Sequence, residues 1–262
     1  MRVGRIAAVV AAGGAVLAGV LAVRAGMPEP AVPSAAAVTP PPSPSPSPSP
    51  SGPPSPPPSP PPPPPITYPA RGEGTWRFAA GGGPVAGRSG QLMRYRVAVE
   101  RGIEGIAPDA FAVEVTRTLA DPRGWTGDGR WRLLRVGNGS PYDFTVYLTT
   151  PGTRDDLCPG DDGYTSCRNG ERVVLNVARW VLGVPRYGAP LSAYREYLVN
   201  HEVGHRLGHG HEKCPGPGRP APVMQQQTLG LHGCVAYGWP LRGGRPYRGP
   251  AGSYDDPVPE GP

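Results

Sequence analysis

The chain has 262 residues, and its 40 Pro and 39 Gly interrupt regular structure often enough to exclude a single all-helical domain. Proline is unevenly spread: it supplies 21 of the 38 residues at 28–65, so positions 66–262 remain for one folded domain of ordinary size. The formal net charge is +6, but the arginines are scattered, with no basic helix and no stripe interleaved with aromatic residues. The composition therefore argues against nucleic-acid binding.

Residues 1–26 predict export. Ile6–Val23 is a run of 18 Ala, Val, Leu, Ile and Gly residues that follows two arginines. It is either a signal peptide or a signal-anchor helix: its length favours an anchor, which needs about 17–25 residues, whereas Ala35–Ala37 would suit cleavage. Both interpretations place the rest of the chain outside the cytoplasm, either anchored to the membrane by this segment or secreted.

Residues 27–65 predict a disordered spacer. They consist mainly of Pro and Ser, with no aromatic residue and almost no charge, so they cannot build a core. In a polyproline II conformation, at about 3.1 Å per residue, the 38 residues at 28–65 would span up to about 115 Å. We therefore expect a stiff spacer that holds the folded domain away from the membrane.

Five segments of the domain predict β-strands, because β-branched and aromatic residues partly alternate with polar ones. In chain order they are Thr75–Ala79, Leu92–Glu100, Trp131–Val136, Phe144–Thr149 and Arg172–Val177. Between the second and third, Phe111, Val115 and Leu119 recur every four residues. This spacing predicts an amphipathic helix over 108–119.

A second helix is predicted later in the chain. Apolar residues recur at helical spacing from Leu191 to Leu207, Ser192 can cap the start, and Gly208 can end it. Beyond Gly208 we expect almost no regular structure. Gly and Pro are abundant there, and the last ten or so residues are expected to be disordered.

Four cysteines, an even number in an exported domain, predict two disulfide bonds. Three pairings are possible. We expect Cys158–Cys167 and Cys214–Cys234, because each pair brackets a loop rich in Gly, Pro and Asp that has little else to hold it. No two cysteines have a ligand spacing such as C-x-x-C, which disfavours a zinc site built on cysteine.

The second predicted helix runs into the sequence H-E-V-G-H-R-L-G-H-G-H. Residues four apart lie on one helix face, so His201 and His205 can bind the same metal ion. Glu202 would lie beside that ion but too far round the helix to be an ordinary ligand, which is where a base for a metal-bound water should stand. Gly208 can take a positive φ and turn the chain so that His211 approaches the same ion.

Three neutral nitrogens and one open position are typical of a catalytic Zn²⁺ ion, whereas a structural zinc would have four protein ligands. Four of the five histidines in the chain fall within positions 201–211, which disfavours an accidental cluster on a helix surface. His209 is either a neighbour of the ligands or an alternative ligand, and the spacing favours His211 as the ligand. The lone His232 is expected to be structural or exposed.

The H-E-x-x-H-x-x-G-x-x-H pattern resembles the metzincin clan of zinc metallopeptidases. The stretch from Cys214 to Thr228 resembles a family of uncharacterised exported actinobacterial proteins with a metzincin-like domain. The likeness covers most of 66–240, with its specific motifs in 198–240, and leaves 241–262 as a Gly/Pro-rich tail. It implies an α+β fold with a mixed five-stranded sheet, a backing helix, an active-site helix and a small irregular C-terminal subdomain.

The same resemblance implies roles for further residues. Met224, 13 positions after His211, would form a Met turn, an apolar floor beneath the zinc ligands. Tyr237 is the nearest downstream tyrosine that could stabilise the oxyanion. The usual C-terminal helix of the clan has no counterpart, and a Cys214–Cys234 bond would replace its bracing. An extended substrate would pair with the edge strand of the sheet, for which the candidates are Val173, Val174, Leu175 and Asn176.

These residues together predict a monomeric, exported zinc-dependent endopeptidase that acts on a protein or peptide. Zinc would polarise the scissile carbonyl, and Glu202 would take a proton from the attacking water and pass it to the leaving amine. The alternative is a pseudopeptidase that holds the metal and binds an envelope partner through its edge strand without cutting. A purely structural module without metal is disfavoured by the histidine spacing.

Overall fold

The protein is described by a computed structural model that covers residues 65–259. The hydrophobic segment Ile6–Val23 and nearly all of the predicted spacer lie outside these residues, so their predicted roles stay predictions. Within 65–259, no helix combines the length and the apolar character needed to cross a membrane.

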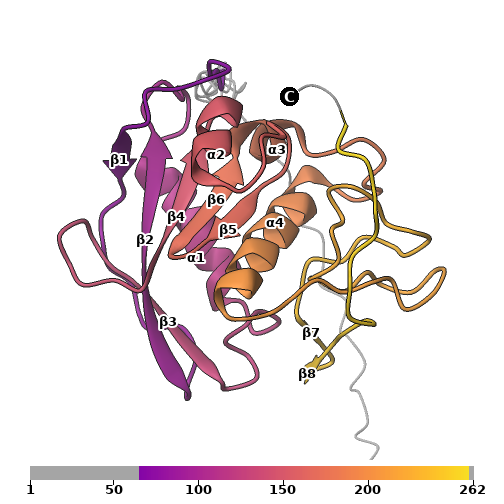
Figure 1. The fold of residues 1–262 in the computed structure, drawn as a ribbon. Coiled ribbons are helices and arrows are strands. Elements are labelled where there is room, and N and C mark those ends of the chain that lie inside the picture. Colours follow the sequence, from indigo (N-terminus) through magenta and orange to yellow (C-terminus); the bar gives the residue numbers. More distant parts are fainter. Residues whose placement is uncertain (1–64, 260–262) are drawn as a thin grey trace, which may run out of the picture. The chain divides into compact units, whose positions relative to one another are not determined.

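A mixed sheet of six strands forms the centre of the domain (Figure 1). Its main path has the order β1-β2-β4-β6-β5, and β3 pairs with the first half of β2. The strands β2, β3, β4 and β6 are parallel, whereas β1 and β5 are antiparallel to their neighbours. The strands are β1 (Trp76–Phe78), β2 (Gln91–Glu100), β3 (Trp131–Arg135), β4 (Phe144–Thr149), β5 (Cys167–Asn169) and β6 (Arg172–Asn176).

The sheet corrects two predictions. It has six strands instead of five, because the sequence analysis missed β5. The prediction that β6 is an edge strand is wrong, since β5 pairs with β6 on the side away from β4. The four residues that were predicted to pair with the substrate are fully buried: Val173, Val174, Leu175 and Asn176.

Four helices accompany the sheet. They are α1 (Pro108–Ala120), α2 (Pro151–Leu157), α3 (Val177–Leu182) and α4 (Leu191–Arg206). The structure confirms the two longer ones, α1 and α4, within a residue of their predicted ends. Ser192 does not cap α4, because Pro190 holds the cap position and no side chain caps the helix. The helices α2 and α3 were not predicted from the sequence, because they have only 7 and 6 residues.

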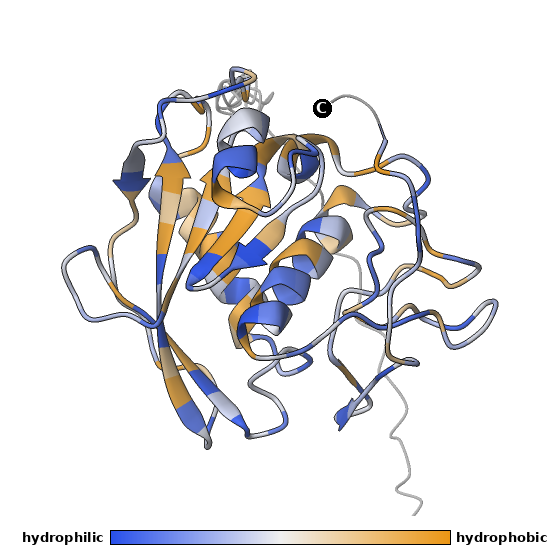
Figure 2. Ribbon diagram, viewed as in Figure 1, coloured by the Kyte–Doolittle hydropathy of each residue, from blue (hydrophilic) through white to orange (hydrophobic). Residues whose placement is uncertain are grey.

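The core lies between one face of the sheet and the helices α1 and α4. Figure 2 shows the apolar residues concentrated on the central strands, while α4 is more polar toward solvent. Alternate residues of the strands join the buried faces of the two helices. The main members are Val97, Val99, Val146, Leu148, Leu175, Phe111, Val115, Tyr194, Tyr197 and Leu198. This packing fixes α4, which carries most of the predicted site, against the sheet.

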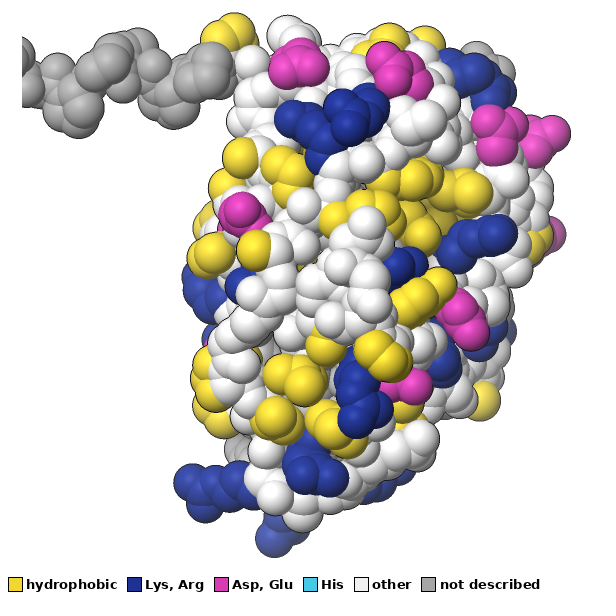
Figure 3. Space-filling view, turned by 90° about the vertical axis from the view of Figure 1, so that its left-hand side faces the viewer, with side chains coloured by type: hydrophobic (Ala, Val, Ile, Leu, Met, Phe, Trp, Pro, Cys, Tyr) yellow, Lys and Arg dark blue, Asp and Glu magenta, His cyan; other side chains and the backbone are white. Residues whose placement is uncertain are grey.

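Aromatic and arginine side chains cover part of the opposite face of the sheet. The Arg96 guanidinium lies 3.5 Å from the ring centre of Tyr142 and 4.9 Å from that of Phe78. The rings of Trp76 and Tyr147 are 4.5 Å apart. Figure 3 shows the β1 side of the molecule, where apolar groups lie among separated basic side chains. These stacked groups shield the sheet there without a further helical layer.

The chain after α4 is mostly irregular, as predicted. Its only strands within the described residues form a small hairpin of β7 (Leu241–Arg242) and β8 (Arg245–Pro246). Both predicted disulfide bonds, Cys158–Cys167 and Cys214–Cys234, are confirmed. Disulfides persist in oxidising compartments, so the pairing supports a location outside the cytoplasm.

Candidate metal centre

The helix α4 and the turn after it bring the predicted ligands together. His201 and His205 lie one helical turn apart on α4. Gly208 has a φ of +90°, which confirms the predicted left-handed turn. The chain then reverses, and His211 returns toward the other two rings.

The three imidazoles converge through their Nε2 atoms. The Nε2 atom of His205 lies 3.2 Å from that of His201 and 3.0 Å from that of His211. Ligand atoms of all three residues lie within 4.8 Å of one another. In a tetrahedral zinc site with Zn–N bonds of about 2.0–2.1 Å, the ligand nitrogens are about 3.3 Å apart. The donor type and the separations therefore fit one such ion.

Each ring also has an oxygen partner at its other nitrogen. The Nδ1 atoms of His201, His205 and His211 lie 2.8 Å from Val223 O, 2.8 Å from His209 O and 3.0 Å from Ser253 Oγ, respectively. A carbonyl oxygen can only accept, so Nδ1 of His201 and His205 carries the proton. Their Nε2 atoms keep the lone pair that a metal ligand needs.

The electrostatics keep these rings neutral. Burial, and then the neighbouring His205 and His211, hold the pKa of His201 well below its usual value. Burial also lowers the pKa of His205, and it lowers the pKa of His211 to about 4, with a contribution from His205. Neutral imidazole is the state that binds metal, so the site is ready to bind at neutral pH.

Glu202 follows the first ligand on α4 and lies in the same pocket. Its side chain is buried, and its Oε2 atom has no hydrogen-bond partner among residues 65–259. Burial raises the pKa of Glu202 to about 8, although the positive charge of Arg154 opposes this rise. A carboxyl group in such surroundings can exchange a proton near neutral pH.

The pocket in front of the histidines has a volume of about 520 Å³. The segment 154–168 forms one wall, to which Thr165 and Arg168 contribute. Gln226, Thr228 and Leu229 also line the pocket. The edge strand β5 lies along this pocket, so an extended chain in the pocket would have a free sheet edge beside it.

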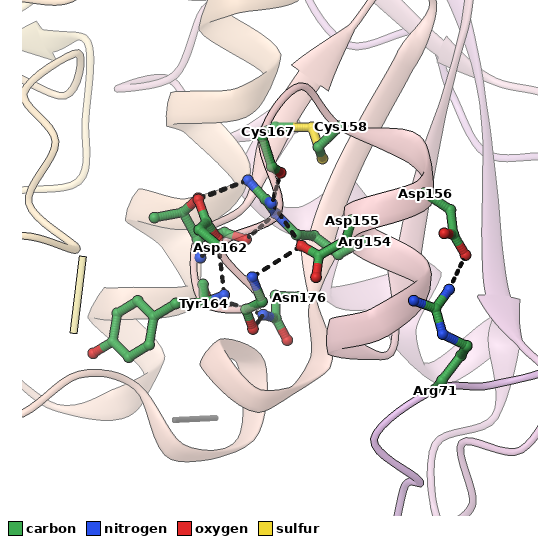
Figure 4. A network of polar contacts seen from close by, with 12 residues as sticks. Arg71, Arg154, Asp155, Asp156, Cys158, Asp162, Tyr164, Cys167 and Asn176 are labelled. Carbon is green, nitrogen blue, oxygen red and sulfur yellow. Dashed lines mark hydrogen bonds and ion pairs between the residues drawn. A yellow bond between two sulfur atoms is a disulfide. The ribbon is translucent and has the colours of Figure 1, made fainter. Parts of the chain in front are cut away.

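A buried arginine that the sequence analysis missed holds one wall (Figure 4). The side chain of Arg154 is 2% exposed and forms ion pairs with Asp155 and Asp162. It also donates hydrogen bonds to Thr165 O and Gly160 O. The Cys158–Cys167 bond closes the same loop. The only sequence signal was two pairs of aspartates, Asp155–Asp156 and Asp161–Asp162, on either side of Cys158.

Met224 lies against α4 in a tight turn. Gln225 N donates to Pro222 O at 3.0 Å, which closes the turn around Met224. A Cβ atom added to Gly204 would lie 2.5 Å from Met224 Sδ and 2.6 Å from the Trp125 ring. Gly204 thus allows Met224 to approach the helix between the two ligands, an arrangement compatible with the expected apolar floor.

The structure places other candidates outside the pocket. Tyr237 is not among its lining residues, and the Tyr237 hydroxyl donates to Leu241 O at 2.7 Å, so the prediction of an oxyanion donor is wrong. His209 neighbours the ligands: its carbonyl bonds to His205, and its ring stacks on Trp125 at 4.3 Å. His232, expected to be structural or exposed, pairs with Asp256.

The fold and the site define an α+β protein with two disulfide bonds and a three-histidine centre at the side of an open pocket. The model of the family described as "Protein of unknown function (DUF3152)" matches residues 62–239, and the chain belongs to this family. The matched range includes the six-stranded sheet, α4 and all three histidines. Neither the curated proteins nor the solved structures give a significant match.

Proposed function

We propose that this protein is a metzincin-like, zinc-dependent endopeptidase that acts outside the cytoplasm. The observation that carries the proposal is the convergence of three imidazole Nε2 atoms beside a buried, unpaired carboxylate in one pocket. The oxygen partners of the three Nδ1 atoms add support, because metal-binding histidines are usually oriented in this way.

The three histidines and Glu202 would have different roles in peptide hydrolysis. A zinc ion held by His201, His205 and His211 would supply Lewis-acid chemistry, which activates a water and polarises a carbonyl. Glu202, whose side chain lines the pocket, would accept the proton of the attacking water. It would then deliver this proton to the leaving amine as the peptide bond breaks.

The substrate strand of the proposal is β5. This strand is antiparallel to β6 and ends the main path of the sheet, and its residues Cys167 and Arg168 line the pocket. A peptide that pairs with the open side of β5 would extend the sheet by one strand. Its scissile bond would then pass in front of the three histidines.

Glu202 also favours a peptidase over a pseudopeptidase. An unpaired buried carboxylate destabilises a fold, because the charged form loses its hydration. A site that only holds a metal gains nothing from such a group. A site that moves protons requires one.

Cleavage of a diverse peptide library by the oxidised, zinc-loaded protein tests the proposal. We expect cuts from the native protein, and we expect Glu202→Ala to keep zinc but to cleave about 10²–10⁴-fold more slowly, the usual loss for a general base. A Glu202→Ala protein with full activity would contradict the assigned role. A native protein that holds zinc and cuts nothing would support the pseudopeptidase.

A further inference from the structure

The C-terminal segment 248–256, here called the C-terminal strap, runs antiparallel to the chain that carries His211. Lys213 N donates to Pro250 O at 2.7 Å, and Gly252 N donates to His211 O at 2.9 Å. Glu212 and Ala251 form a bridge between these two hydrogen bonds. In Figure 1 the yellow end of the chain returns along the segment that follows α4. The expectation that the last ten or so residues are disordered is therefore wrong for Ser253–Asp256.

Both ends of the strap are fastened by side chains. At its start, Gly249 N donates to the buried Glu212 carboxylate at 2.9 Å. At its end, Asp256 lies 2.8 Å from His232 Nε2, and the Tyr254 ring stacks on His232 at 3.5 Å. The residue His232 belongs to the loop that follows the pocket wall at Leu229. The strap thus joins the third histidine to the loop beside the pocket.

The middle of the strap reaches the candidate metal centre itself. Ser253 Oγ lies 3.0 Å from His211 Nδ1. The other two histidines use backbone carbonyls for this contact, whereas His211 depends on a side chain 42 positions later in the chain. Ser253 also lies beyond the range 62–239 that the family model matches.

We propose that the C-terminal strap completes the metal centre and that Ser253 is the positioning residue for His211. The Ser253 hydroxyl accepts the Nδ1 proton of His211, which fixes the ring orientation and leaves Nε2 for the metal. The strap is largely exposed, so these few bonds hold it in place. Because the strap and the metal favour the same position of His211, each stabilises the other. This inference rests on the metal site of the proposed function.

The test measures zinc affinity of the full-length chain by competition with a chelator. We expect Ser253→Ala to bind zinc about 10-fold more weakly, since partners of ligand histidines typically contribute 10–100-fold. Ser253→Thr keeps the hydroxyl and should restore most of the affinity. Ser140→Ala is the matched control, because Ser140 is exposed and far from the site in the chain. Of these three variants, only Ser253→Ala should shift the visible absorption band of the Co²⁺-loaded protein.

A double-mutant cycle separates the strap from its serine. Asp256→Ala removes the clamp on His232 without touching a histidine of the metal centre, and it should also weaken zinc binding. If the strap acts through Ser253, the double variant Ser253→Ala/Asp256→Ala should bind zinc no more weakly than Ser253→Ala alone. Fully additive losses would overturn the coupling.

Two results separate this inference from the proposed function. Native protein that binds zinc, with Ser253→Ala equal to Ser140→Ala, overturns the role of the strap and leaves the peptidase proposal standing. Native protein that binds no zinc overturns the proposed function. In that case ¹⁵N spectra of the metal-free histidines decide: loss of the His211 Nδ1–H tautomer in Ser253→Ala supports the positioning role, and identical spectra overturn it.

Discussion

Gly204 shows how closely the candidate site is packed at the level of single atoms. Glycine within a helix is destabilising by about 1 kcal/mol relative to alanine, so a packing reason is expected. Here the reason is the approach of Met224 and Trp125, and the Trp125 ring is held by a hydrogen bond from its Nε1 atom to Asn200 O at 2.9 Å. The conformational weakness of α4 at this point is offset by contact with the apolar floor.

Gly204→Ala should therefore destabilise the protein and disturb the candidate metal centre. The new methyl group would overlap Met224 Sδ, and we expect a loss of about 1–3 kcal/mol in the free energy of unfolding. Zinc affinity should fall as well, because the backbone shift moves His201 relative to His205. Denaturant unfolding and chelator competition measure the two effects. Gly210→Ala is the control, since a Cβ there meets no atom within 4 Å; equal behaviour of the two variants would refute the packing argument.

Glu202 gives a prediction for the metal-free protein. Burial raises its folded-state pKa from the ordinary 4.5 to about 8, so the unfolded chain loses this proton first, and stability falls between about pH 4.5 and 8 and levels off above pH 8. Between pH 5 and 7 the native protein should lose roughly 2 kcal/mol of stability that Glu202→Gln retains. The variant should also melt a few degrees higher at pH 9. If the melting temperatures of the two proteins change equally with pH over this range, burial does not destabilise the charged form of the Glu202 carboxyl group.

At the level of elements, the loop between α2 and β5 depends on one buried cation. Arg154→Met would leave Asp155 and Asp162 without their partner, and loss of one member of a buried pair is destabilising by about 3–5 kcal/mol. The two aspartates are 20% and 23% exposed, so we expect the lower end of that range. Denaturant unfolding would measure it. Arg71→Met is the matched control: it removes the exposed pair with Asp156 and should change stability by less than about 1 kcal/mol.

The elements that could be predicted from the sequence are those with a long periodic pattern. The helices α1 and α4 bury one face over 13 and 16 residues, which leaves a clear spacing of apolar residues. The strand β5 has only three residues between a disulfide and the turn at Gly170, so no alternation can be seen. It exists because β6 offers a pairing edge. Without β5, β6 is the last strand that the sequence predicts, and the prediction that it forms the edge is therefore wrong.

The sequence likewise predicts some contacts of the candidate site and not others. Local spacing on a helix predicts that His201, Glu202 and His205 lie together, and a glycine turn extends this to His211. The oxygen partners come from distant segments, Val223 on the turn beside α4 and Ser253 on the C-terminal strap. Such contacts depend on the path of the whole chain. Tyr237 was placed wrongly because sequence distance does not show that its hydroxyl faces the β7 hairpin.

At the scale of the whole molecule, the sheet half and the irregular half differ in what holds them together. The half up to Leu207 holds most of the continuous core. After it only a few residues, such as Val223 and Met224, join that core, and the chain depends further on one disulfide bond, hydrogen bonds and the C-terminal strap. The histidine centre lies where the two halves meet, because α4 supplies His201 and His205 and the irregular half supplies His211. A bound metal would therefore stabilise the weaker half against the stronger one.

Zinc should accordingly raise the melting temperature. At 100 times its dissociation constant a ligand adds about 2.7 kcal/mol, which for a domain of this size corresponds to roughly 5–10 °C, and a chelator should reverse the gain. The pH dependence follows from the histidines. The pKa of His211 is lowered to about 4 and those of His201 and His205 are also lowered, so protons compete with the metal only in acid.

Thermal unfolding with zinc or with chelator from pH 8 to pH 4 checks this dependence. The gain in melting temperature should be nearly constant from pH 8 to about 6 and should disappear as the pH approaches 4, because the folded rings stay neutral below the ordinary histidine pKa of about 6.5. His211→Ala should lose the gain at every pH, whereas Ser140→Ala, an exposed position outside the centre and the strap, should keep it. A gain that is already lost at pH 6.5 would mean that ordinary exposed histidines bind the metal, and the three-histidine centre would no longer account for it.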